Sequence, residues 1–527
     1  MAFNFQKNNN IIWDVNEELL IKADSKTPKL YKKEIIPTAI VKVVADEKFV
    51  GGYGTKQVDE LSELDNHLLG KGEKFILDLG NHYVGNFSID IASIGSPMDA
   101  PLYLKLRFAE IPAELEFNTD EYEGWLSKSW IQEEFVHLDV LPATLSLPRR
   151  YSCRYIEIEV IDSSPKWKAK FSTPVFRART SANRENLKDL QVQDHTLKQI
   201  YDVSVKTLED CMQLVYEDGP KRDRRMWIGD LRLQALANYS TFQDKDLVER
   251  SLYLFAGMRT DSGKIPANVF IAPSNTPDDT FLFEYSLNFT TILSEYYDEF
   301  KNINLIKELY SVSKDSIDLA ITYIDDEGRF VEDESWPIFC DWSSNFDKTT
   351  AGQAMVIFTL KKFIRLAQVV NDSEIDKYQA VLDKMVVFSQ SNLFDKDLRL
   401  FVVEKNNEIN VASQVWMVIA GVMSCEENKL IMQTTIDKLF PISGIATPYM
   451  YHHINEALFI AGLKGEGEQF MKEYWGKMIK MGADTFWEAF APEDPTYSPY
   501  NSPAINSYCH AWSCTPAYLI DKYILNN

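Results

Sequence analysis

Residues 217–230 read EDGPKRDRRMWIGD and connect two predicted helices. Upstream, apolar residues recur at steps of three and four from Leu197 to Met212, which indicates an amphipathic helix. Gly219-Pro220 does not fit a continued helix, because proline has no amide hydrogen to donate and restricts the residue before it. A second apolar-periodic run begins at Leu231. We therefore predict a loop held between rigid helices, where functional residues are often found.

The charges of this loop have two interpretations. A loop rich in acidic and basic residues is often only a solvated charge cluster. A tryptophan beside carboxylates, such as Trp227 beside Asp230, also offers what a sugar ring needs: an apolar face for its C–H groups and acceptors for its hydroxyls. Carboxylates among arginines have strongly environment-dependent pKa values, which acid–base catalysis requires. The loop alone leaves both interpretations open.

Composition limits the class of protein. A chain of 527 residues predicts two domains or three, and 45% apolar residues indicate a globular protein. Acidic residues (78) exceed basic residues (55), which argues against nucleic-acid or anionic-membrane partners. No apolar run reaches about 18 residues, and the first residues show no apolar run behind a basic stretch, so we expect neither a membrane span nor a signal peptide.

The number and spacing of the cysteines indicate the compartment of the protein. Six cysteines are scattered without the spacing of a disulfide framework, which is typical of free thiols in a cytoplasmic protein. Cys509, His510 and Cys514 lie close in sequence, but no second cluster with zinc-ligand spacing accompanies them. We therefore expect no metal.

The pattern of residues 36–180 predicts β structure. Apolar residues alternate with polar ones at 102–108 and 156–160, and residues 75–79 and 87–91 predict two further strands with glycines marking turns between them. Short strands at regular intervals favour a jelly-roll-like β-sandwich. An aromatic and acidic insertion either rims a site or covers a sandwich edge, and we favour the edge cover; it contains Tyr122, Trp125, Trp130, Glu133 and Glu134.

The pattern changes near residues 180–183. Beyond them helical stripes dominate, for example at 357–367, 378–385 and 470–478, and no repeat indicates a solenoid. We therefore predict a β-sandwich domain at residues 1–182 and a closed helical domain at 183–527. Loops that converge on one rim of the helical domain would form one pocket.

A second candidate site surrounds Glu488, which follows Trp487 in the run GADTFWE at 482–488. A single glutamate among aromatic residues is either a rim residue or a base that holds water against a sugar. His510 is either satisfied within the core or bonded to a hydroxyl. Hydrolysis of a glycoside needs two carboxyl groups, and Asp223 and Glu488 form a sensible pair.

These motifs resemble glycoside hydrolase family 78, the bacterial α-L-rhamnosidases, over most of the chain. The resemblance rests on DGPKRDR (218–224), WIGD (227–230), TFWE (485–488) and SYCHAW (507–512), with weaker support from PRRY (148–151) and FCDW (339–342). It implies an (α/α)6 six-hairpin barrel behind an N-terminal β-sandwich. It also implies inverting hydrolysis of terminal α-L-rhamnose from a small-molecule glycoside, with no cofactor, because two carboxylates and water suffice.

The family pattern also implies roles for single residues. Glu488 corresponds to the general base. Rhamnose-contacting positions correspond to Asp218, Arg222, Trp227, Asp230, Trp342 and His510. Many members read Asp-Cys-Pro-x-Arg-Asp-Glu-Arg, with the glutamate as general acid, and direct alignment places Arg224 there. Counting back seven residues from Asp230 places the acid at Asp223 instead. Aspartate is shorter than glutamate by about 1.5 Å, one C–C bond, so the backbone would have to lie closer to the substrate.

The chain ends seventeen residues past His510, so we expect a compact member without the C-terminal β-domain that many members carry. Two alternatives stay open: a glycosidase of the same fold that acts on another sugar, and a non-catalytic rhamnoside-binding protein. The sequence predicts no oligomeric state and no aglycone or linkage preference.

Overall fold

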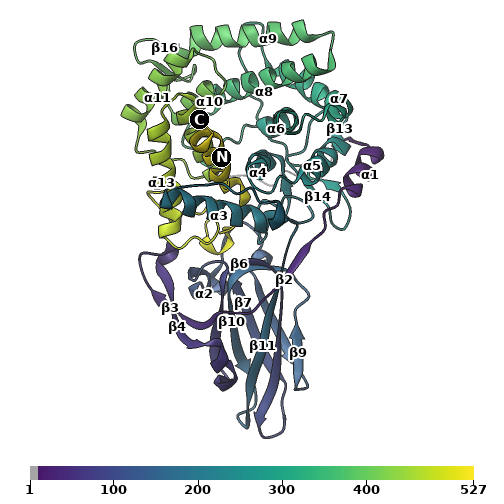
Figure 1. Ribbon diagram of the computed structural model, residues 1–527, viewed down its shortest axis with the longest axis vertical. Coiled ribbons are helices and arrows are strands. Elements are labelled where there is room, and N and C mark those ends of the chain that lie inside the picture. Colours follow the sequence, from purple (N-terminus) through teal and green to yellow (C-terminus); the bar gives the residue numbers. More distant parts are fainter. Residues whose placement is uncertain (1–9, 527) are drawn as a thin grey trace.

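The computed structural model describes residues 10–526, in which strands gather in one domain and helices in another (Figure 1). We call these the sheet domain and the helical domain. The fold class predicted from the sequence, β-sandwich followed by a helical six-hairpin domain, is confirmed. No helix among the described residues is long and apolar enough to cross a membrane.

One long strand, β6 (Lys74–Gly95), joins the two halves of the single ten-stranded sheet of the sheet domain. Its first half pairs with β3 (Ala39–Ala45) and β10 (Tyr151–Asp162). Its second half pairs with β9 (Ala143–Ser146) and β11 (Trp167–Thr180). Inward side chains of both halves meet in one buried cluster, so the sheet folds over on itself as a sandwich, with β6 contributing to both layers.

The remaining strands extend the two halves of this sheet. The sheet around the first half of β6 continues through β10 to β7 and β8, and through β3 to β4, while β2 and β5 pair with β11. Their bounds are β2 (Tyr31–Ile35), β4 (Tyr53–Glu60), β5 (Leu68–Leu69), β7 (Leu102–Ala109) and β8 (Glu133–Leu138).

The prediction of two strands at 75–79 and 87–91 separated by a turn is wrong, because β6 runs through both. Gly80 adopts φ 80°, which bends the strand without ending it. At Gly85 an added Cβ would lie 2.1 Å from the Arg177 carbonyl oxygen of β11. Both glycines therefore allow bending and close strand approach instead of marking a turn.

Six inner helices form a closed ring in the described part of the helical domain, each in contact with the next and the last with the first. They are α4 (Ile228–Tyr239), α6 (Phe283–Phe300), α8 (Thr349–Val370), α10 (Val411–Ile419), α12 (Pro448–Ile460) and α14 (Pro516–Leu519), which continues as a π-helix to Leu525. All twelve residues of α4 are buried, as expected for a helix enclosed on every side.

Six outer helices alternate with the inner ones along the chain and complete the predicted hairpins. They are α3 (His195–Cys211), α5 (Lys245–Gly257), α7 (Ile303–Ala320), α9 (Ile375–Phe388), α11 (Cys425–Leu439) and α13 (Lys464–Lys480). Short elements lie in the connections: α2 (Ala113–Glu116), β12 (Met226–Trp227), β14 (Asn268–Phe270), β15 (Thr276–Pro277), β16 (Phe394–Asp395) and β17 (Leu400–Phe401).

The first described segment crosses to the helical domain, beside α5 in Figure 1. β1 (Trp13–Val15) pairs with β13 (Met258–Thr260), and α1 (Glu17–Ser25) packs on α5. Leu19, Leu20 and Ala23 of α1 join the buried core of the helical domain. Residues 13–25 of the predicted 1–182 domain therefore pack with the other domain, because the apolar face of α1 is buried there. The boundary at 182/183 stays a prediction.

We expect Leu20→Ala to lower the free energy of unfolding of the helical domain by about 2–3 kcal/mol, because Leu20 is 7% exposed and packs against Gly257. Its neighbour Ile21 is 66% exposed, so Ile21→Ala should change stability by less than about 0.5 kcal/mol. Urea denaturation, followed on the helical-domain transition, measures both. Equal losses for the two variants would contradict the docking of α1.

Candidate active site

A cavity of about 340 Å³ opens where loops of the helical domain meet the sheet domain. All eight residues selected from the sequence line it: Asp218, Arg222, Asp223, Trp227, Asp230, Trp342, Glu488 and His510. The two motif regions are more than 250 positions apart in sequence, and a hydrogen bond between Arg222 and Glu488 spans 266 of them. The structure thus brings every predicted site residue together; their roles stay predictions.

The loop before α4 folds back on itself and directs Asp223 into the cavity. The Asp218 amide donates to the Arg225 carbonyl over 3.0 Å, which closes the loop. Oδ1 of Asp223 accepts from Trp227 Nε1 at 3.2 Å and from the Arg225 amide at 3.4 Å, while Arg225 Nε lies 3.5 Å from Oδ2. These three groups fix the orientation of the Asp223 carboxylate.

Arg224 points away from the cavity. Its Nε donates to the Pro220 carbonyl at 2.9 Å, and its Nη2 donates to the Arg150 carbonyl of the sheet domain at 2.8 Å. Arg224 is not among the cavity-lining residues. The side chain that this loop presents to the cavity is therefore that of Asp223, in agreement with the count made back from Asp230.

Glu488 is held by donors on both oxygens. Oε2 accepts from Arg222 Nη2 at 2.5 Å and from the Ser507 amide at 3.1 Å, and Oε1 accepts from the Tyr500 hydroxyl. Burial alone would raise the pKa of Glu488, but the Arg222 guanidinium and the Tyr500 hydrogen bond lower it below its usual value of 4.5. Glu488 is therefore ionised near neutrality, as a base requires.

Tyr500 was not selected from the sequence as a site residue. It lies in the run SPY at 498–500, and no spacing rule connects it with Glu488. The Arg222 guanidinium lies over its ring at 4.0 Å. Tyr500 therefore contacts both members of the buried ion pair.

Three buried polar groups at the cavity have unused hydrogen-bonding atoms. Within residues 10–526, Asp218 Oδ1, Asp230 Oδ1 and His510 Nδ1 accept or donate no hydrogen bond, and the last two atoms lie 3.5 Å apart. Burial, reinforced by neighbouring carboxylates, raises the pKa values of Asp218 and Asp230 well above their usual range. Burial lowers the pKa of His510 to about 4, so its imidazole is neutral at pH 7. Such atoms are positioned to bind ligand hydroxyls.

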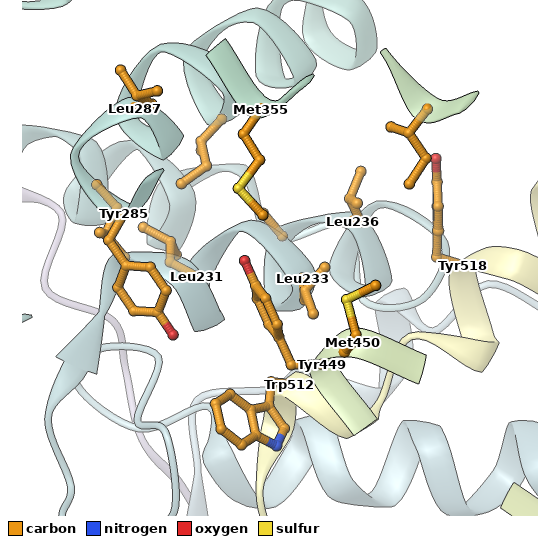
Figure 2. Close-up of a cluster of buried hydrophobic side chains, with 14 of the residues drawn as sticks. Leu231, Leu233, Leu236, Tyr285, Leu287, Met355, Tyr449, Met450, Trp512 and Tyr518 are labelled. Carbon is orange, nitrogen blue, oxygen red and sulfur yellow. The ribbon is translucent and has the colours of Figure 1, made fainter. Parts of the chain in front are cut away.

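Aromatic rings form the cavity walls between these polar groups. Trp227 and Tyr285 meet edge to face at 6.4 Å, and Phe339 meets Trp342 at 5.3 Å. Tyr285 and Trp512 also line the cavity, and Figure 2 shows both beside Tyr449 in the buried core of the helical ring. Apolar walls with a few convergent polar atoms are typical of a small-ligand pocket.

The sheet domain supplies part of the cavity, which overturns one interpretation of the sequence. Trp125, Leu126, Ser127 and Trp130 line it, so our preference for a sandwich-edge cover is wrong for this stretch. Trp125 Nε1 donates at 3.2 Å to the Pro499 carbonyl, 374 positions away. Contacts this distant in sequence are not visible in local patterns.

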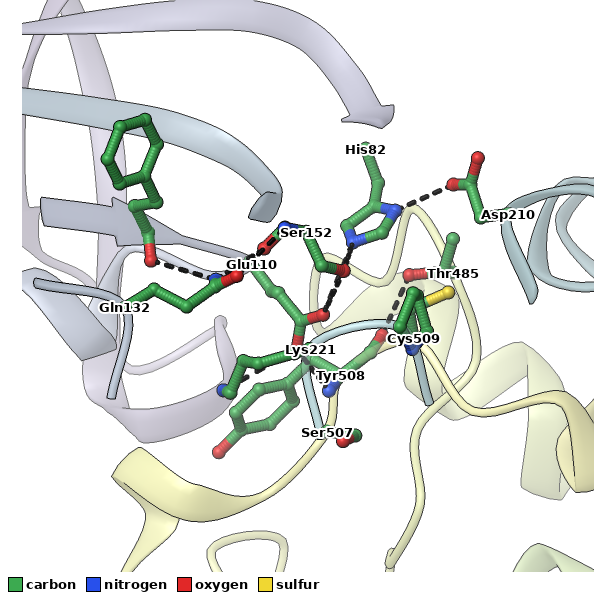
Figure 3. A network of polar contacts seen from close by, with 12 residues as sticks. His82, Glu110, Gln132, Ser152, Asp210, Lys221, Thr485, Ser507, Tyr508 and Cys509 are labelled. Carbon is green, nitrogen blue, oxygen red and sulfur yellow. Dashed lines mark hydrogen bonds and ion pairs between the residues drawn. The ribbon is translucent and has the colours of Figure 1, made fainter. Parts of the chain in front are cut away.

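A buried polar network joins the sheet domain to the loop of residues 218–225 and to residues 506–508 (Figure 3). Glu110 Oε2 accepts from the Tyr508 amide at 2.6 Å and lies 3.5 Å from Lys221 Nζ. Lys221 Nζ also donates to the Asn506 carbonyl at 2.6 Å and pairs with Glu114. The network thus connects the loop of Asp223 with the segment that follows Glu488. No sequence pattern predicted that Glu110 and Lys221 would connect the two domains.

One buried group in the described part of the chain has converging potential metal ligands: His82, Asp210 and Cys509, whose ligand atoms lie within 4.8 Å of one another. His82 Nδ1 is 2.6 Å from Asp210 Oδ2, and His82 Nε2 is 3.0 Å from Ser152 Oγ. Hydrogen bonds therefore account for this arrangement. The group does not line the cavity and differs from the Cys509, His510 and Cys514 set considered from the sequence.

Comparisons with known proteins agree with this geometry. Residues 37–178 match the glycosyl hydrolase family 78 alpha-rhamnosidase N-terminal domain, and residues 186–524 match the bacterial alpha-L-rhamnosidase 6 hairpin glycosidase domain. A rhamnosidase from Klebsiella oxytoca with rhamnose bound is 39% identical, with a TM-score of 0.95, over 97% of this chain and 100% of its own. A comparison with curated proteins found no match.

More distant structures share the fold. The family 78 rhamnosidase of Bacillus sp. GL1 is 20% identical with a TM-score of 0.73, over 90% of this chain and 49% of its own. The Streptomyces avermitilis α-L-rhamnosidase complexed with L-rhamnose is 15% identical with a TM-score of 0.66, over 94% of this chain and 44% of its own.

Proposed function

The chain belongs to glycoside hydrolase family 78, and from this premise we propose that it releases terminal α-L-rhamnose from small α-L-rhamnosides with inversion. The observation that carries the proposal is the shared cavity of Asp223 and Glu488, with Glu488 held ionised by Arg222. The chain is a glycoside hydrolase; the inverting mechanism and the residue roles below are the proposal.

Glu488 acts as general base. Of its two oxygens, Oε2 already accepts from Arg222 and Ser507, whereas Oε1 accepts from Tyr500 and has a further lone pair for a water molecule. Glu488 takes a proton from this water as the water oxygen attacks the anomeric carbon. The charge on Glu488 is neutralised in this step, while Arg222 keeps the carboxylate oriented.

Asp223 acts as general acid. Because Oδ1 accepts from the Trp227 indole and the Arg225 amide, the transferable proton lies on Oδ2. Asp223 gives this proton to the glycosidic oxygen as the C–O bond breaks. One proton leaves Asp223 and one arrives at Glu488, so exchange with solvent restores both groups. Attack by water on one face and departure from the other inverts the anomeric centre.

Asp218, Asp230 and His510 hold the sugar. The unused oxygens of the two aspartates accept from ring hydroxyls, and the neutral His510 imidazole contributes one nitrogen to a hydroxyl. The aromatic walls, with Trp342 among them, take the C–H faces and the methyl group of rhamnose.

We also propose a cytoplasmic location. All six cysteines are free within the part of the chain that the structure describes, and free thiols are typical of reducing compartments.

A panel of aryl glycosides tests the substrate. We expect turnover of the α-L-rhamnoside and not of other deoxy or uronic glycosides. Turnover of another sugar alone would make the chain a family 78 glycosidase with a different specificity. Rhamnose binding by calorimetry without hydrolysis of any glycoside would make it a binding protein.

We expect Glu488→Gln and Asp223→Asn each to lower kcat by about a hundredfold to ten-thousandfold on an alkyl rhamnoside, because each removes a proton-transfer group. A dinitrophenyl leaving group needs no proton, so on that substrate Asp223→Asn should recover much of its activity and Glu488→Gln should not. Steady-state kinetics on both substrates measure this, with the exposed Glu123→Gln as control. Near-wild-type activity of Asp223→Asn on the alkyl rhamnoside would refute the acid assignment.

The acid limb of the pH profile of kcat/KM should follow the protonation of Glu488. Because the pKa of Glu488 lies below 4.5, kcat/KM should fall only below that pH, where the base becomes protonated. Tyr500→Phe removes a hydrogen bond to the charged form, so the pKa should rise and the acid limb should move up by about one pH unit. Tyr497→Phe, on the same loop but not lining the cavity, should leave the limb in place. An unmoved limb in Tyr500→Phe would contradict the assignment.

A further inference from the structure

We propose that a second cavity, where the sheet domain joins the helical domain, binds a phosphate group. This second cavity has a volume of about 460 Å³ and shares no lining residue with the cavity of Asp223 and Glu488. Its walls come from β2, β6 and β11 of the sheet domain, from α3, and from the connection at residues 182–185. The inference goes beyond the proposed function and does not depend on it.

The second cavity is basic, although the chain as a whole is strongly acidic. The protein carries a formal net charge of −23, yet five basic and three acidic residues line this cavity, an excess of two positive charges. Two of the basic residues have carboxylate partners. Arg184 donates to Glu209 at 2.7 Å, and Lys206 donates to Asp210 at 2.6 Å. Within residues 10–526, the exposed Glu185 is the one lining carboxylate without an ion pair, and three lining cations have none: Lys32, Lys33 and Arg179.

Two of these cations stand directly opposite each other in the sheet. In the antiparallel pairing of β11 with β2, Arg179 faces Lys32, whereas the next pair on the same face, Arg177 and Glu34, forms an ion pair at 3.3 Å. Directly opposite residues are close neighbours, and like charges there are unfavourable. The sheet therefore has opposite charges beside the second cavity and like charges at it. An anion held between Arg179 and Lys32 would stabilise this pair.

The Arg179 guanidinium has no acceptor within the described part of the chain. Its Nε is buried without a hydrogen bond, and its side chain forms no ion pair there. Burial and the nearby Arg150 guanidinium lower the pKa of Arg179. Glu217 acts in the opposite direction, but it already accepts from Arg150 at 2.7 and 2.8 Å. A bound anion would supply the charge and the acceptor oxygens that this side chain needs.

The amide side chains of the second cavity also present unused donors. Oδ1 of Asn81 accepts from the His82 amide at 2.7 Å, and Oδ1 of Asn183 accepts from the Glu185 amide at 3.1 Å. Neither Nδ2 donates a hydrogen bond to a described residue. Unused donors beside excess positive charge favour a ligand that only accepts. A phosphate monoester carries about −1.5 to −2 charges near neutrality and three acceptor oxygens, which matches the excess charge of the cavity.

Thermal unfolding of the full chain tests this site, with inorganic phosphate and glucose 6-phosphate as probes and sodium chloride at matched ionic strength as the reference. Because the lining residues come from both domains, bound phosphate should raise Tm by about 2–5 °C. Calorimetry measures the affinity of each probe. Tighter binding of glucose 6-phosphate would identify a phosphate ester as the ligand, and equal affinity would identify the phosphate group alone.

Substitutions at the like-charge pair locate the binding. We expect Arg179→Gln to weaken phosphate binding about ten- to hundredfold, the size of one charge-assisted hydrogen bond. Lys32→Glu leaves Arg179 intact and gives it an opposite charge, so it should raise Tm without phosphate and remove the phosphate-dependent rise. Arg177→Gln is the matched control, because it removes the same charge from the same strand outside the second cavity and should leave phosphate binding unchanged.

Three results would overturn the inference. The first is a rise in Tm with phosphate no larger than with chloride. The second is an equal effect of Arg179→Gln and Arg177→Gln on phosphate affinity, including no effect of either. The third is loss of phosphate binding in saturating rhamnose, which would place the anion in the cavity of Asp223 and Glu488. A chain that cleaves no rhamnoside but binds phosphate through Arg179 would overturn the proposed function and leave this site standing.

Discussion

The buried ion pair of Arg222 and Glu488 joins the two loops that make the site. Breaking a buried pair by removing one partner costs about 3–5 kcal/mol, because the other charge is left uncompensated. Arg222 precedes Asp223 in the chain, and its carbonyl accepts from Ser507 Oγ at 2.7 Å. Arg222, which pairs with the proposed base, therefore also anchors the backbone that presents the proposed acid.

Four consecutive side chains of this loop contact four different parts of the structure. Lys221 binds Glu110 and Glu114 of the sheet domain, Arg222 binds Glu488, Asp223 enters the cavity, and Arg224 donates to the Arg150 carbonyl. Two of these four contacts require the sheet domain. The sheet domain therefore helps to hold the site together, and its residues Trp125, Leu126, Ser127 and Trp130 line the cavity.

The sequence predicted what depends on local spacing. Helical stripes with a period of 3.6 residues predicted α8, α9 and α13, and short motifs predicted all eight residues that meet in the cavity. Contacts between distant segments were missed. The continuity of β6, the docking of α1 on α5, and the places of Tyr500 and Trp125 each depend on a partner far away in the chain. Glycines in a strand and apolar faces in a helix do not specify such partners.

In the mechanism that we propose, Asp223 and Glu488 act from opposite sides of the glycosidic bond, with water as the nucleophile. Proton NMR of the first sugar released from an aryl α-L-rhamnoside tests it most directly, before mutarotation mixes the anomers. We expect β-L-rhamnose to form first and the α-anomer to follow only by mutarotation. Initial release of α-L-rhamnose would mean retention, and would contradict a base that acts through water.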